Sequence, residues 1–436
     1  MKAETIDTMP LDWRERSLDE LCFLRKELVE PSSAGNNRYV GLEHVDPGIA
    51  QIRRWGNDKD LRSTKSRFYA GDVLYGKLRP YLDKAALAEW EGVCSTDILT
   101  LNPRTEVADP RYLSFLLHAS AFINHAVATT SGVNHPRTSW ASIASFLHPI
   151  PPLLEQKAIA AVLSKIQTAA EVQEKIVTAL RELKAATMAK LFREGLRGER
   201  LKQTEIGEMP ESWEVRQMRG ITEVITKGSS PNWQGFEYCE NGVLFIRSQN
   251  IGLGELLLSE VVRLPEEFNL KERRSILSPG DLLINIVGAS IGRAAVADKR
   301  LNRANINQAV ALVRFRSGYN PFFFMHFLIT RGGLDQMHRQ KKEIARANLS
   351  LEDVGSFLVP VPAREEQDQI ADSLESASKR IRAAERKRDG LKGLFSSMLH
   401  LLMTGQVRVR ELIGVKDNLQ GVSETKITKG VAGWNS

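Results

Sequence analysis

The chain has 436 residues, which is enough for two or three domains with hydrophobic cores of their own. Its hydrophobic content of 42% and charged content of 26% are ordinary for a soluble protein, and no apolar run has the roughly 18 residues of a membrane-spanning helix. The net charge of +7 favours a polyanionic partner such as nucleic acid.

The N-terminal segment lacks the charged-then-apolar layout of a signal peptide, so we expect a cytoplasmic protein. The three cysteines, Cys22, Cys94 and Cys239, are isolated in the sequence. This spacing argues against a disulfide framework and against a cysteine-based zinc site, and we expect no bound metal.

Residues 1–152 are predicted to form a mixed α/β domain. Short strands are expected at 39–42, 72–75 and 97–101, where apolar side chains cluster between turn residues. A Gly-Asp pair at 71–72 marks the turn that enters the second of these strands.

A long helix is predicted over 153–196, after a Pro-x-Pro that favours an extended approach and a sharp start. Its apolar positions recur at alternating steps of four and three residues, which is the pattern of a coiled-coil seam. The seam has three polar interruptions and runs through Ile159, Leu163, Ile166, Ala170, Gln173, Val177, Leu180, Lys184, Thr187 and Leu191.

Residues 197–362 are predicted to form a second mixed α/β domain, with strands at 243–246, 281–284 and 309–313. A second long helix over 363–405 follows another Pro-x-Pro. Its seam, interrupted only by an arginine, runs through Ile370, Leu374, Ala377, Ile381, Ala384, Arg388, Leu391, Phe395, Met398 and Leu402. Residues 406–436 form a C-terminal tail, and its polar part after Arg410 is expected to be loosely ordered.

The second half of the chain repeats the first. The segment 149–163 aligns with 360–374 at a constant spacing of 211 positions, including the Pro-x-Pro and a Glu-Gln pair. A period this long indicates a duplicated domain and helix rather than a solenoid. The segments 51–68 and 253–276 are dissimilar, so the scaffold is repeated and the loops are not. Two reading heads for two different sequences would require this combination.

Each long helix would expose its seam to water if it stood alone. The two helices either pack on each other or dock separately on their own domains, and we favour mutual pairing. Because a domain separates the helices in the sequence, antiparallel pairing would place the two domains at opposite ends.

The sequence contains no metalloprotease, P-loop or nucleophile-elbow motif. Asn320-Pro321-Phe322-Phe323 is similar to the Asn-Pro-Pro-aromatic motif of amino-methyltransferases, but the second proline is missing and no methyl-donor site lies upstream. An Asn-Pro turn that opens an apolar helix explains this segment better, and we predict no catalytic residue.

Side chains that can neutralise phosphates or pair with base edges occur in the loops of both domains. In the first domain the DNA-binding candidates are Arg53, Arg54, Lys65, Arg67, Lys77, Arg79 and Tyr81. In the second domain they are Arg247, Ser248, Gln249, Asn250, Arg303, Asn305, Asn307, Gln308, Lys341, Lys342 and Arg346. Any single one of them can instead be a solvated surface residue, and Asn305 and Gln308 can equally satisfy buried backbone groups at a strand start.

Several segments together resemble the specificity subunit of type I restriction–modification systems, over nearly the whole chain. In the first half the resemblance rests on 39–45, 71–81 and 94–97. In the second half it rests on 206–213 and 227–231, and in both halves on the Pro-x-Pro-x-x-x-Glu-Gln helix starts. The halves diverge just after the Gly-Asp strand, where Lys77-Leu78-Arg79-Pro80 aligns with Ile286-Val287-Gly288-Ala289. A contact inferred for one half therefore does not transfer to the other.

The resemblance implies an α/β (α+β) fold with a pseudo-two-fold internal repeat, in which two target recognition domains are separated by two long antiparallel coiled-coil helices. Each domain would read one half of a bipartite, asymmetric site in double-stranded DNA, and the helices would set the gap and dock two methyltransferase subunits. Restriction and translocase subunits would join them in the full complex. S-adenosylmethionine, ATP and Mg²⁺ would be bound by those partners, and no cofactor by this chain.

Two other interpretations stay open. The first is a fused restriction–methylation enzyme, against which the chain length and the missing methyl-donor loop argue. The second is a coiled-coil adaptor without a DNA role, against which the loops rich in Arg, Asn and Gln argue. Binding of S-adenosylmethionine by the isolated chain would favour the first, and a salt-sensitive DNA-binding assay decides the second.

Overall fold

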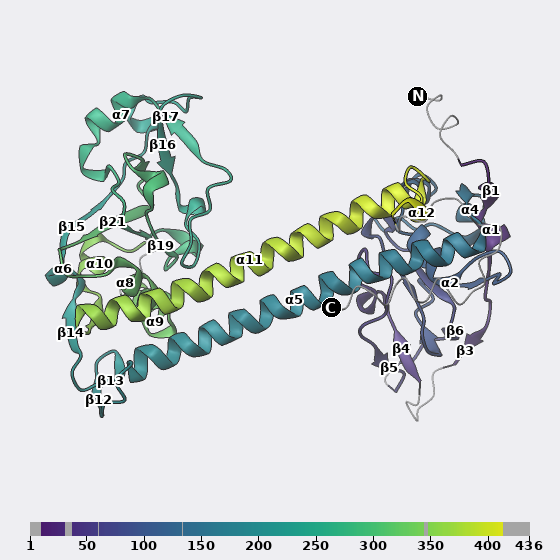
Figure 1. The fold of residues 1–436 in the computed structure, drawn as a ribbon, viewed down its shortest axis with the longest axis horizontal. Helices are drawn as coiled ribbons and strands as arrows, with labels where there is room; N and C mark the ends of the chain where they lie inside the picture. Colours follow the sequence, from purple (N-terminus) through teal and green to yellow (C-terminus); the bar gives the residue numbers. More distant parts are fainter. Residues whose placement is uncertain (1–9, 31–36, 60, 133, 344–347, 413–436) are drawn as a thin grey trace. The chain divides into compact units, whose positions relative to one another are not determined.

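The computed structural model describes residues 10–30, 37–59, 61–132, 134–343 and 348–412 (Figure 1). The chain divides into two compact units, one formed by residues 1–174 with 386–436 and the other by residues 175–385. Each unit contains one mixed α/β domain and parts of both long helices. The predicted tail is described as far as the end of α12 (Val409–Leu412), and the rest of it lies outside the described residues.

The first domain is built mainly from two sheets. Its strands are β1 (Arg14–Ser17), β2 (Cys22–Leu24), β3 (Leu28–Val29), β4 (Arg38–Val40), β5 (Gly56–Asn57), β6 (Lys65–Phe68), β7 (Val73–Gly76), β8 (Ala85–Leu87), β9 (Gly92–Cys94), β10 (Ile98–Pro103) and β11 (Leu147–Ile150). Its helices are α1 (Leu18–Leu21), α2 (Pro110–Leu116), α3 (Ser120–Ala128) and α4 (Trp140–Ile143), with 3₁₀ turns at η1 (Leu42–His44) and η2 (Pro80–Leu82). One sheet has the order β2-β10-β7-β8 and the other the order β3-β6-β9-β4-β5, while β1 pairs with β11.

The second domain has a closely similar arrangement. Its strands are β12 (Leu201–Thr204), β13 (Gly207–Pro210), β14 (Glu214–Gln217), β15 (Thr222–Lys227), β16 (Val243–Ile246), β17 (Val262–Leu264), β18 (Leu282–Asn285), β19 (Ala294–Val296), β20 (Asn305–Ile306), β21 (Val310–Phe315) and β22 (Leu358–Val361). Its helices are α6 (Met218–Ile221), α7 (Glu266–Lys271), α8 (Pro321–Leu328), α9 (Arg331–Glu343) and α10 (Leu351–Ser356), and its 3₁₀ turns include η3 (Asn232–Gln234), η4 (Ser248–Asn250) and η6 (Gly288–Ser290). The sheets have the orders β15-β21-β18-β19 and β17-β16-β20, and two further pairs are β14-β22 and β12-β13.

The sheet orders confirm the internal repeat. The sheet β2-β10-β7-β8 matches β15-β21-β18-β19 strand for strand, and β1-β11 matches β14-β22. The strands predicted from the sequence are β4, β7 and β10 in the first domain and β16, β18 and β21 in the second, each within two residues of the expected bounds. The dissimilar segments also differ in structure, because the first domain adds β5 and β6 where the second has β17 and α7.

The aspartate of each Gly-Asp pair is a buried structural anchor. Asp72 accepts hydrogen bonds from Arg25 Nε at 2.9 Å and from Asn102 Nδ2 at 2.7 Å. Asp281 accepts one from Arg314 Nε at 2.7 Å, and this bond raises the pKa of the Arg314 guanidinium above its ordinary value. A buried carboxylate needs such a partner, so the motif belongs to the fold rather than to a reaction.

The two long helices are α5 (Leu153–Glu194) and α11 (Arg364–Met403), close to the predicted bounds. No residue of either predicted seam is fully exposed, including the polar interruptions Gln173, Lys184 and Arg388. Every position of both predicted seams is therefore at least partly buried, which is consistent with the coiled-coil pattern.

In both units α5 and α11 run antiparallel and share ion pairs. In the first unit, Glu174 of α5 lies 3.0 Å from Lys392 Nζ and 3.4 Å from Arg388 Nη1. In the second unit, Arg181 of α5 pairs with Glu385 of α11 at 2.5 Å. The helices thus pair with each other, as favoured from the sequence.

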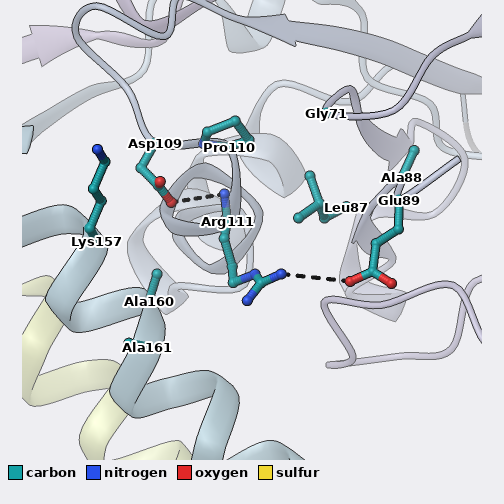
Figure 2. A pocket seen from close by; sticks show the side chains of 10 residues that line it. All are labelled: Gly71, Leu87, Ala88, Glu89, Asp109, Pro110, Arg111, Lys157, Ala160 and Ala161. Atoms are coloured by element: carbon teal, nitrogen blue, oxygen red, sulfur yellow. Dashed lines mark hydrogen bonds and ion pairs between the residues drawn. The ribbon is translucent and has the colours of Figure 1, made fainter. Parts of the chain in front are cut away.

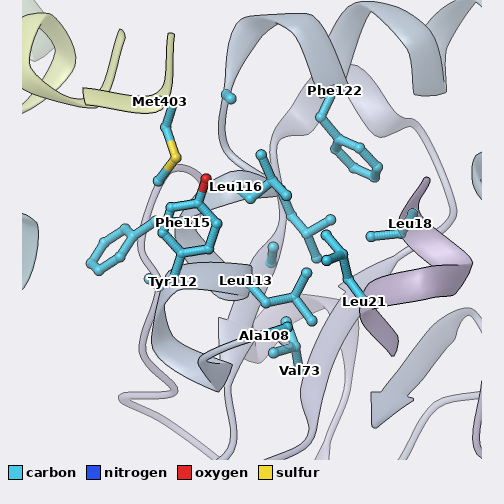
Figure 3. Close-up of a cluster of buried hydrophobic side chains, with 14 of the residues drawn as sticks. Leu18, Leu21, Val73, Ala108, Tyr112, Leu113, Phe115, Leu116, Phe122 and Met403 are labelled. Atoms are coloured by element: carbon cyan, nitrogen blue, oxygen red, sulfur yellow. The ribbon is translucent and has the colours of Figure 1, made fainter. Parts of the chain in front are cut away.

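The alternative of docking on a domain also holds, because both helices enter the domain cores. In the first unit, Ile159 and Leu163 of α5 and Leu402 and Met403 of α11 belong to one buried cluster with α2 (Figure 3). In the second unit, Ile370 and Leu374 of α11 pack in the corresponding cluster with Phe192 of α5. Pairing and docking are therefore combined rather than exclusive.

The repeated Glu-Gln pair explains how each helix start is fastened to its domain. Glu155 accepts the Trp13 indole N–H at 3.1 Å, and Gln156 Oε1 accepts the backbone N–H of Asp109, the N-cap of α2, at 2.8 Å. In the second unit, Glu366 Oε2 accepts the Trp213 indole N–H at 3.3 Å and Gln367 Oε1 accepts the Asn320 N–H at 2.9 Å. The Glu-Gln pair thus ties each helix start to its domain, and we call these contacts the latch of each unit.

Candidate DNA interface

In the first domain, three loops begin beside one another at the ends of neighbouring strands. Strands β4 and β9 are parallel, and the Ser95 backbone N–H donates to the Val40 carbonyl at 2.9 Å. The Lys77 N–H donates to the Asp97 carbonyl at 3.0 Å, which brings the end of β7 to the same place. We call the loops that begin at residues 41, 77 and 95 the strand-end loops of the first domain.

The second domain has the same frame. Strands β16 and β20 are parallel, and the Asn307 N–H donates to the Ile246 carbonyl at 3.0 Å. The Ile286 N–H donates to the Ala309 carbonyl, also at 3.0 Å. The strand-end loops of the second domain therefore begin at residues 247, 286 and 307.

The loop after β7 presents three of the predicted candidates, Lys77, Arg79 and Tyr81. Tyr81 is more than half exposed, and among the described residues no carboxylate pairs with Lys77 or Arg79. Cations without an acidic partner are free to contact phosphates or base edges.

The backbone of Arg79 is unusual. Its φ is +53°, in the left-handed region that costs an ordinary residue about 1–2 kcal/mol, and its N–H donates to the Pro136 carbonyl at 2.7 Å. The aligned residue of the second domain is Gly288, which has φ +71° and bears no such cost. The strained backbone at a position that suits glycine makes the Arg79 side chain a candidate for DNA contact, which the matched variants Arg79→Gly and Arg79→Ala test.

Two other first-domain candidates pair with carboxylates. Arg53 forms an ion pair with Glu171 of α5, and Arg54 donates to the Glu43 carbonyl at 2.8 Å and to Asp46 at 2.5 Å. Their charges are already matched, so they are weaker candidates than Lys77 and Arg79.

Lys65 and Arg67 of β6 also contact protein groups. Lys65 is buried and its Nζ donates to the hydroxyl and the carbonyl of Ser63, each at 2.6 Å. The Arg67 guanidinium lies 5.6 Å from the Tyr69 ring centroid and 3.9 Å from Glu91. As placed, Lys65 cannot reach DNA without leaving its pocket.

In the second domain, the loop after β16 has one exposed candidate, and its other candidates contact protein groups. Gln249 is exposed, while the Arg247 guanidinium lies 5.7 Å from the Tyr238 ring centroid. Asn250 is only 1% exposed, and its side chain bonds the Arg247 N–H and the Leu257 carbonyl, each at 3.0 Å. Asn250 therefore stabilises the loop. Ser248 lies partly buried in the same turn, and its carbonyl accepts a hydrogen bond from Asn285 Nδ2 at 2.8 Å.

The loop after β20 divides its candidates in the same way. Asn305 is fully buried, its Nδ2 donates to the Glu272 carbonyl at 3.0 Å and its Oδ1 accepts the Ile306 N–H at 2.9 Å, so the buried-backbone alternative is the better one here. Asn307 is half-buried and accepts the Ala309 N–H at 3.2 Å, whereas Gln308 is exposed.

Arg303 is exposed and lies 3.6 Å from Glu266. Arg346 lies outside the described residues, and of Lys341 and Lys342 only the backbone, in α9, is described. The second-domain candidates that remain in the strand-end loops are the exposed Gln249 and Gln308 and the half-buried Arg247 and Asn307.

Sequence reasoning missed Lys227 as a candidate. An ideal Cβ at Gly228 would lie 1.7 Å from the Ile306 carbonyl oxygen, so only glycine lets this loop lie against the end of β20. This close approach places the exposed Lys227 next to the strand-end loops. Its signal in the sequence was the segment 227–231, which entered only as part of the resemblance.

Sequence reasoning also missed Arg38, an exposed cation of β4, as a DNA-binding candidate. Its guanidinium lies 4.8 Å from the Trp55 ring centroid and 4.9 Å from that of Trp90. These stacking partners are far from Arg38 in the sequence, so no local pattern could reveal them.

Nothing in the described structure has the geometry of a reaction site. No cluster of three or more His, Cys, Asp and Glu side chains able to hold a metal occurs in the described ranges. Burial raises the pKa of the Cys22 and Cys94 thiols to about 12, which makes them unreactive. Within those ranges, too, no helix is long and apolar enough to cross a bilayer.

A pocket of about 390 Å³ lies in the first unit between the starts of α2 and α5 (Figure 2). Arg111 pairs with Glu89 across it at 3.6 Å, and Asp109 caps α2 with an acceptor distance of 3.1 Å to the Arg111 N–H. Ala160 and Ala161 line its floor. Glu89, Asp109 and Arg111 are each held by these contacts, and Lys157 is the remaining charged group of the lining.

Comparison with known proteins places these features in a family. The model of the type I restriction modification DNA specificity domain matches residues 10–182 and again residues 210–392. The chain is 25% identical to the type I restriction enzyme MjaVIII specificity subunit of Methanocaldococcus jannaschii, over 93% of this chain and 95% of that protein. It is also 25% identical to the type I restriction enzyme EcoBI specificity subunit of Escherichia coli, over 83% of this chain and 78% of that protein.

Two solved structures have a similar fold. The S subunit of a type I restriction-modification system from M. genitalium superimposes with a TM-score of 0.59 at 16% identity, over 92% of this chain and 98% of that one. A chain from a study of complex assembly and conformational transition in a type I R-M system has a TM-score of 0.55 at 20% identity, over 92% and 99%. Because the family model matches both halves and covers most of its length, the chain belongs to the type I restriction modification DNA specificity domain family.

Proposed function

We propose that the chain is the DNA sequence-specificity subunit of a type I restriction–modification complex, in which each domain reads one half of a bipartite, asymmetric DNA site. The observation that carries this proposal is the pair of strand-end loop frames, which share their backbone hydrogen bonds and differ in the side chains they present. A shared frame with different side chains is what two readers of different base sequences require.

The chain contributes no catalytic group in this proposal. Two methyltransferase subunits bind it and transfer methyl from S-adenosylmethionine to adenine, and restriction and translocase subunits that use ATP and Mg²⁺ complete the assembly. Exposed apolar side chains on α5, namely Leu154, Val172, Ile176 and Leu183, support a protein partner on that helix, because a solvated helix face is normally polar.

The helices are proposed to set the gap between the two half-sites. Lengthening the helices tests this role. The end of α5, near Gly195, is a poor place for an insertion because it is closely packed: a Cβ at Gly195 would lie 2.9 Å from Pro210 and 3.3 Å from Trp213. Inserting one heptad into both helices, after Glu174 and after Glu385, keeps the seam in register and adds roughly 10 Å at about 1.5 Å per residue. With about 3.4 Å per base pair, the gap should lengthen by about three pairs. An unchanged gap in an active complex would refute the spacer role.

The proposal as a whole is tested by mapping methylated adenines in the source genome with and without this gene. Loss of one bipartite methylation pattern on deletion, and its return on complementation, is the expected result. Unchanged methylation in a strain with the matching methyltransferase would exclude the proposed function.

A further inference from the structure

The segment between β15 and β16 holds a tryptophan out in solvent. Trp233, in the 3₁₀ turn η3, is 93% exposed, compared with 56% for Tyr81 and 48% for Trp55. Large aromatic side chains are usually buried, so an indole presented this way is unexplained by the packing of this domain.

Both ends of this segment are fastened to the strand-end loops of the second domain. At its start, Gly228 lies against the backbone of Ile306 and Asn307. At its other end, the Tyr238 ring lies under the Arg247 guanidinium at 5.7 Å. Trp233 is therefore at the tip of a loop whose two ends adjoin the loops that are proposed to read DNA.

The turn that carries Trp233 is well braced. The Pro231 carbonyl accepts the N–H groups of Gln234 at 2.9 Å and Phe236 at 3.1 Å. The Phe236 ring packs edge-on against Phe268 at 5.4 Å, and Gln234 Nε2 donates to Glu272. The indole is thus displayed by a fixed turn rather than by a free strand of chain.

The chemistry of the tip fits a nucleobase. No residue from 228 to 236 is charged, and the exposed Asn232 adjoins Trp233 with its amide, while the Gln234 amide is used within the fold by its bond to Glu272. Flat apolar side chains inserted at a base step, beside amides that bond base edges, are a means by which proteins unstack and kink DNA. Stacking on an aromatic side chain needs no particular base, so it adds affinity and distortion without adding sequence information.

We propose that Trp233 is a DNA wedge: its indole stacks against a base step at the half-site read by the second domain and opens that step. The proposal rests on the DNA-specificity function proposed above. A competing role, as an anchor for the methyltransferase partner, fits the exposed aromatic ring but not the position of both loop ends beside the reading loops.

The experiment uses the complex of the full chain with its methyltransferase partner and a duplex that carries the mapped site. 2-Aminopurine replaces single bases at successive positions, and its fluorescence rises where a base is unstacked. The variants are Trp233→Ala and Trp233→Phe, with Leu270→Ala as the control, because Leu270 is also an exposed apolar residue (65%) of the second domain.

A target base that the methyltransferase flips out should brighten with every variant. We expect one further position, at the step opened by the indole, to brighten with the wild-type complex and with Leu270→Ala, to stay dark with Trp233→Ala and to brighten in part with Trp233→Phe. Affinity for the duplex should fall about tenfold in Trp233→Ala. The dependence of affinity on salt should stay unchanged, because no phosphate contact is removed.

Trp233→Ala with wild-type affinity and a wild-type fluorescence profile would overturn the wedge. Weakened assembly with the methyltransferase and unchanged DNA binding would also overturn it, in favour of a partner surface. A wild-type complex that fails to bind the mapped duplex would overturn the proposed function itself, and the wedge with it.

Discussion

The two domains share a backbone frame and place their polar side chains on different parts of it. In the first domain, Lys77 and Arg79 follow β7, where the second domain has Ile286 and Gly288. In the second domain, the turn after β16 carries Gln249, where the corresponding turn of the first carries Glu43. The backbone hydrogen bonds at the strand ends agree within about 0.1 Å, so at these ends the two domains share a frame and differ in the side chains that it carries.

This comparison predicts that the two domains act independently on DNA. Replacing residues 10–149 with the same region of a relative should change one half of the recognised sequence completely and leave the other half unchanged, because residues far apart couple weakly. Mapping methylated adenines in cells that express the chimera gives the result. A chimera with both half-sequences altered would contradict the division of labour, and a chimera built from the second domain is the reciprocal control.

The latches of the two units should differ strongly in strength. In the first unit, Arg408 pairs with the latch residue Glu155 at 2.5 Å and with Asp12 at 2.7 Å, and its side chain is 8% exposed. In the second unit, the cation beside the latch residue Glu366 is Arg197, which is 51% exposed and lies farther away, at 3.6 Å. Arg408→Ala leaves Glu155 without its charge partner and should destabilise the first unit by about 3 kcal/mol. Arg197→Ala should cost the second unit less than about 1 kcal/mol. Hydrogen exchange of β1–β11 and β14–β22 reports the two units separately, and equal losses would contradict the prediction.

The Arg408 effect should also depend on pH. The hydrogen bond from Arg408 holds the pKa of Asp12 below its ordinary value of 3.8. A carboxylate whose pKa is lower in the folded than in the unfolded protein adds stability at pH values above its unfolded-state pKa. This added stability is lost as the pH falls through its folded-state pKa. The stability difference between wild type and Arg408→Ala should therefore be full at neutral pH and shrink below about pH 4. Asp12 is half exposed, so its share of the difference is small.

The sequence predicted the parts of this molecule that follow from periodicity and repetition. The seam residues of α5 and α11 recur every three or four positions, the Gly-Asp pair recurs after 209 positions and the Glu-Gln pair after 211, so all of them could be found without a structure. The candidate site was predicted less well. Asn250 and Asn305 have the right chemistry for base readout, but the backbone carbonyls of Leu257 and Glu272 accept from their amides, and only the folded chain brings those groups together.

Trp233 and Arg38 were missed for the same reason. Their significance depends on exposure and on stacking partners, which a linear pattern does not contain.

The cations of the first domain and the amides of the second should affect DNA binding differently. Lys77→Ala with Arg79→Ala should weaken binding through the first half-site, and each lost phosphate contact should reduce the salt slope by about one. Gln249→Ala with Gln308→Ala should instead leave the salt slope unchanged and relax the second half-site, at about 1–3 kcal/mol per lost base contact. Titrations at several salt concentrations, with single-base variants of each half-site, separate the two effects. Identical behaviour of the two pairs would refute the contrast.

The smallest expected effect tests whether Arg79 is kept for its side chain. Arg79→Gly removes the left-handed strain and should stabilise the first unit by up to about 1 kcal/mol, while it weakens DNA binding as much as Arg79→Ala does. Gly288→Ala, at the aligned position, should destabilise the second unit by about the same amount, because its φ of +71° disfavours a side chain and no atom within 4 Å adds a clash. Thermal unfolding of matched variants, read with DNA affinity at one salt concentration, measures both quantities. If Arg79→Gly left DNA binding intact, the strained arginine would have no role in recognition, and the loop after β7 would lose its claim to be the reading surface of the first domain.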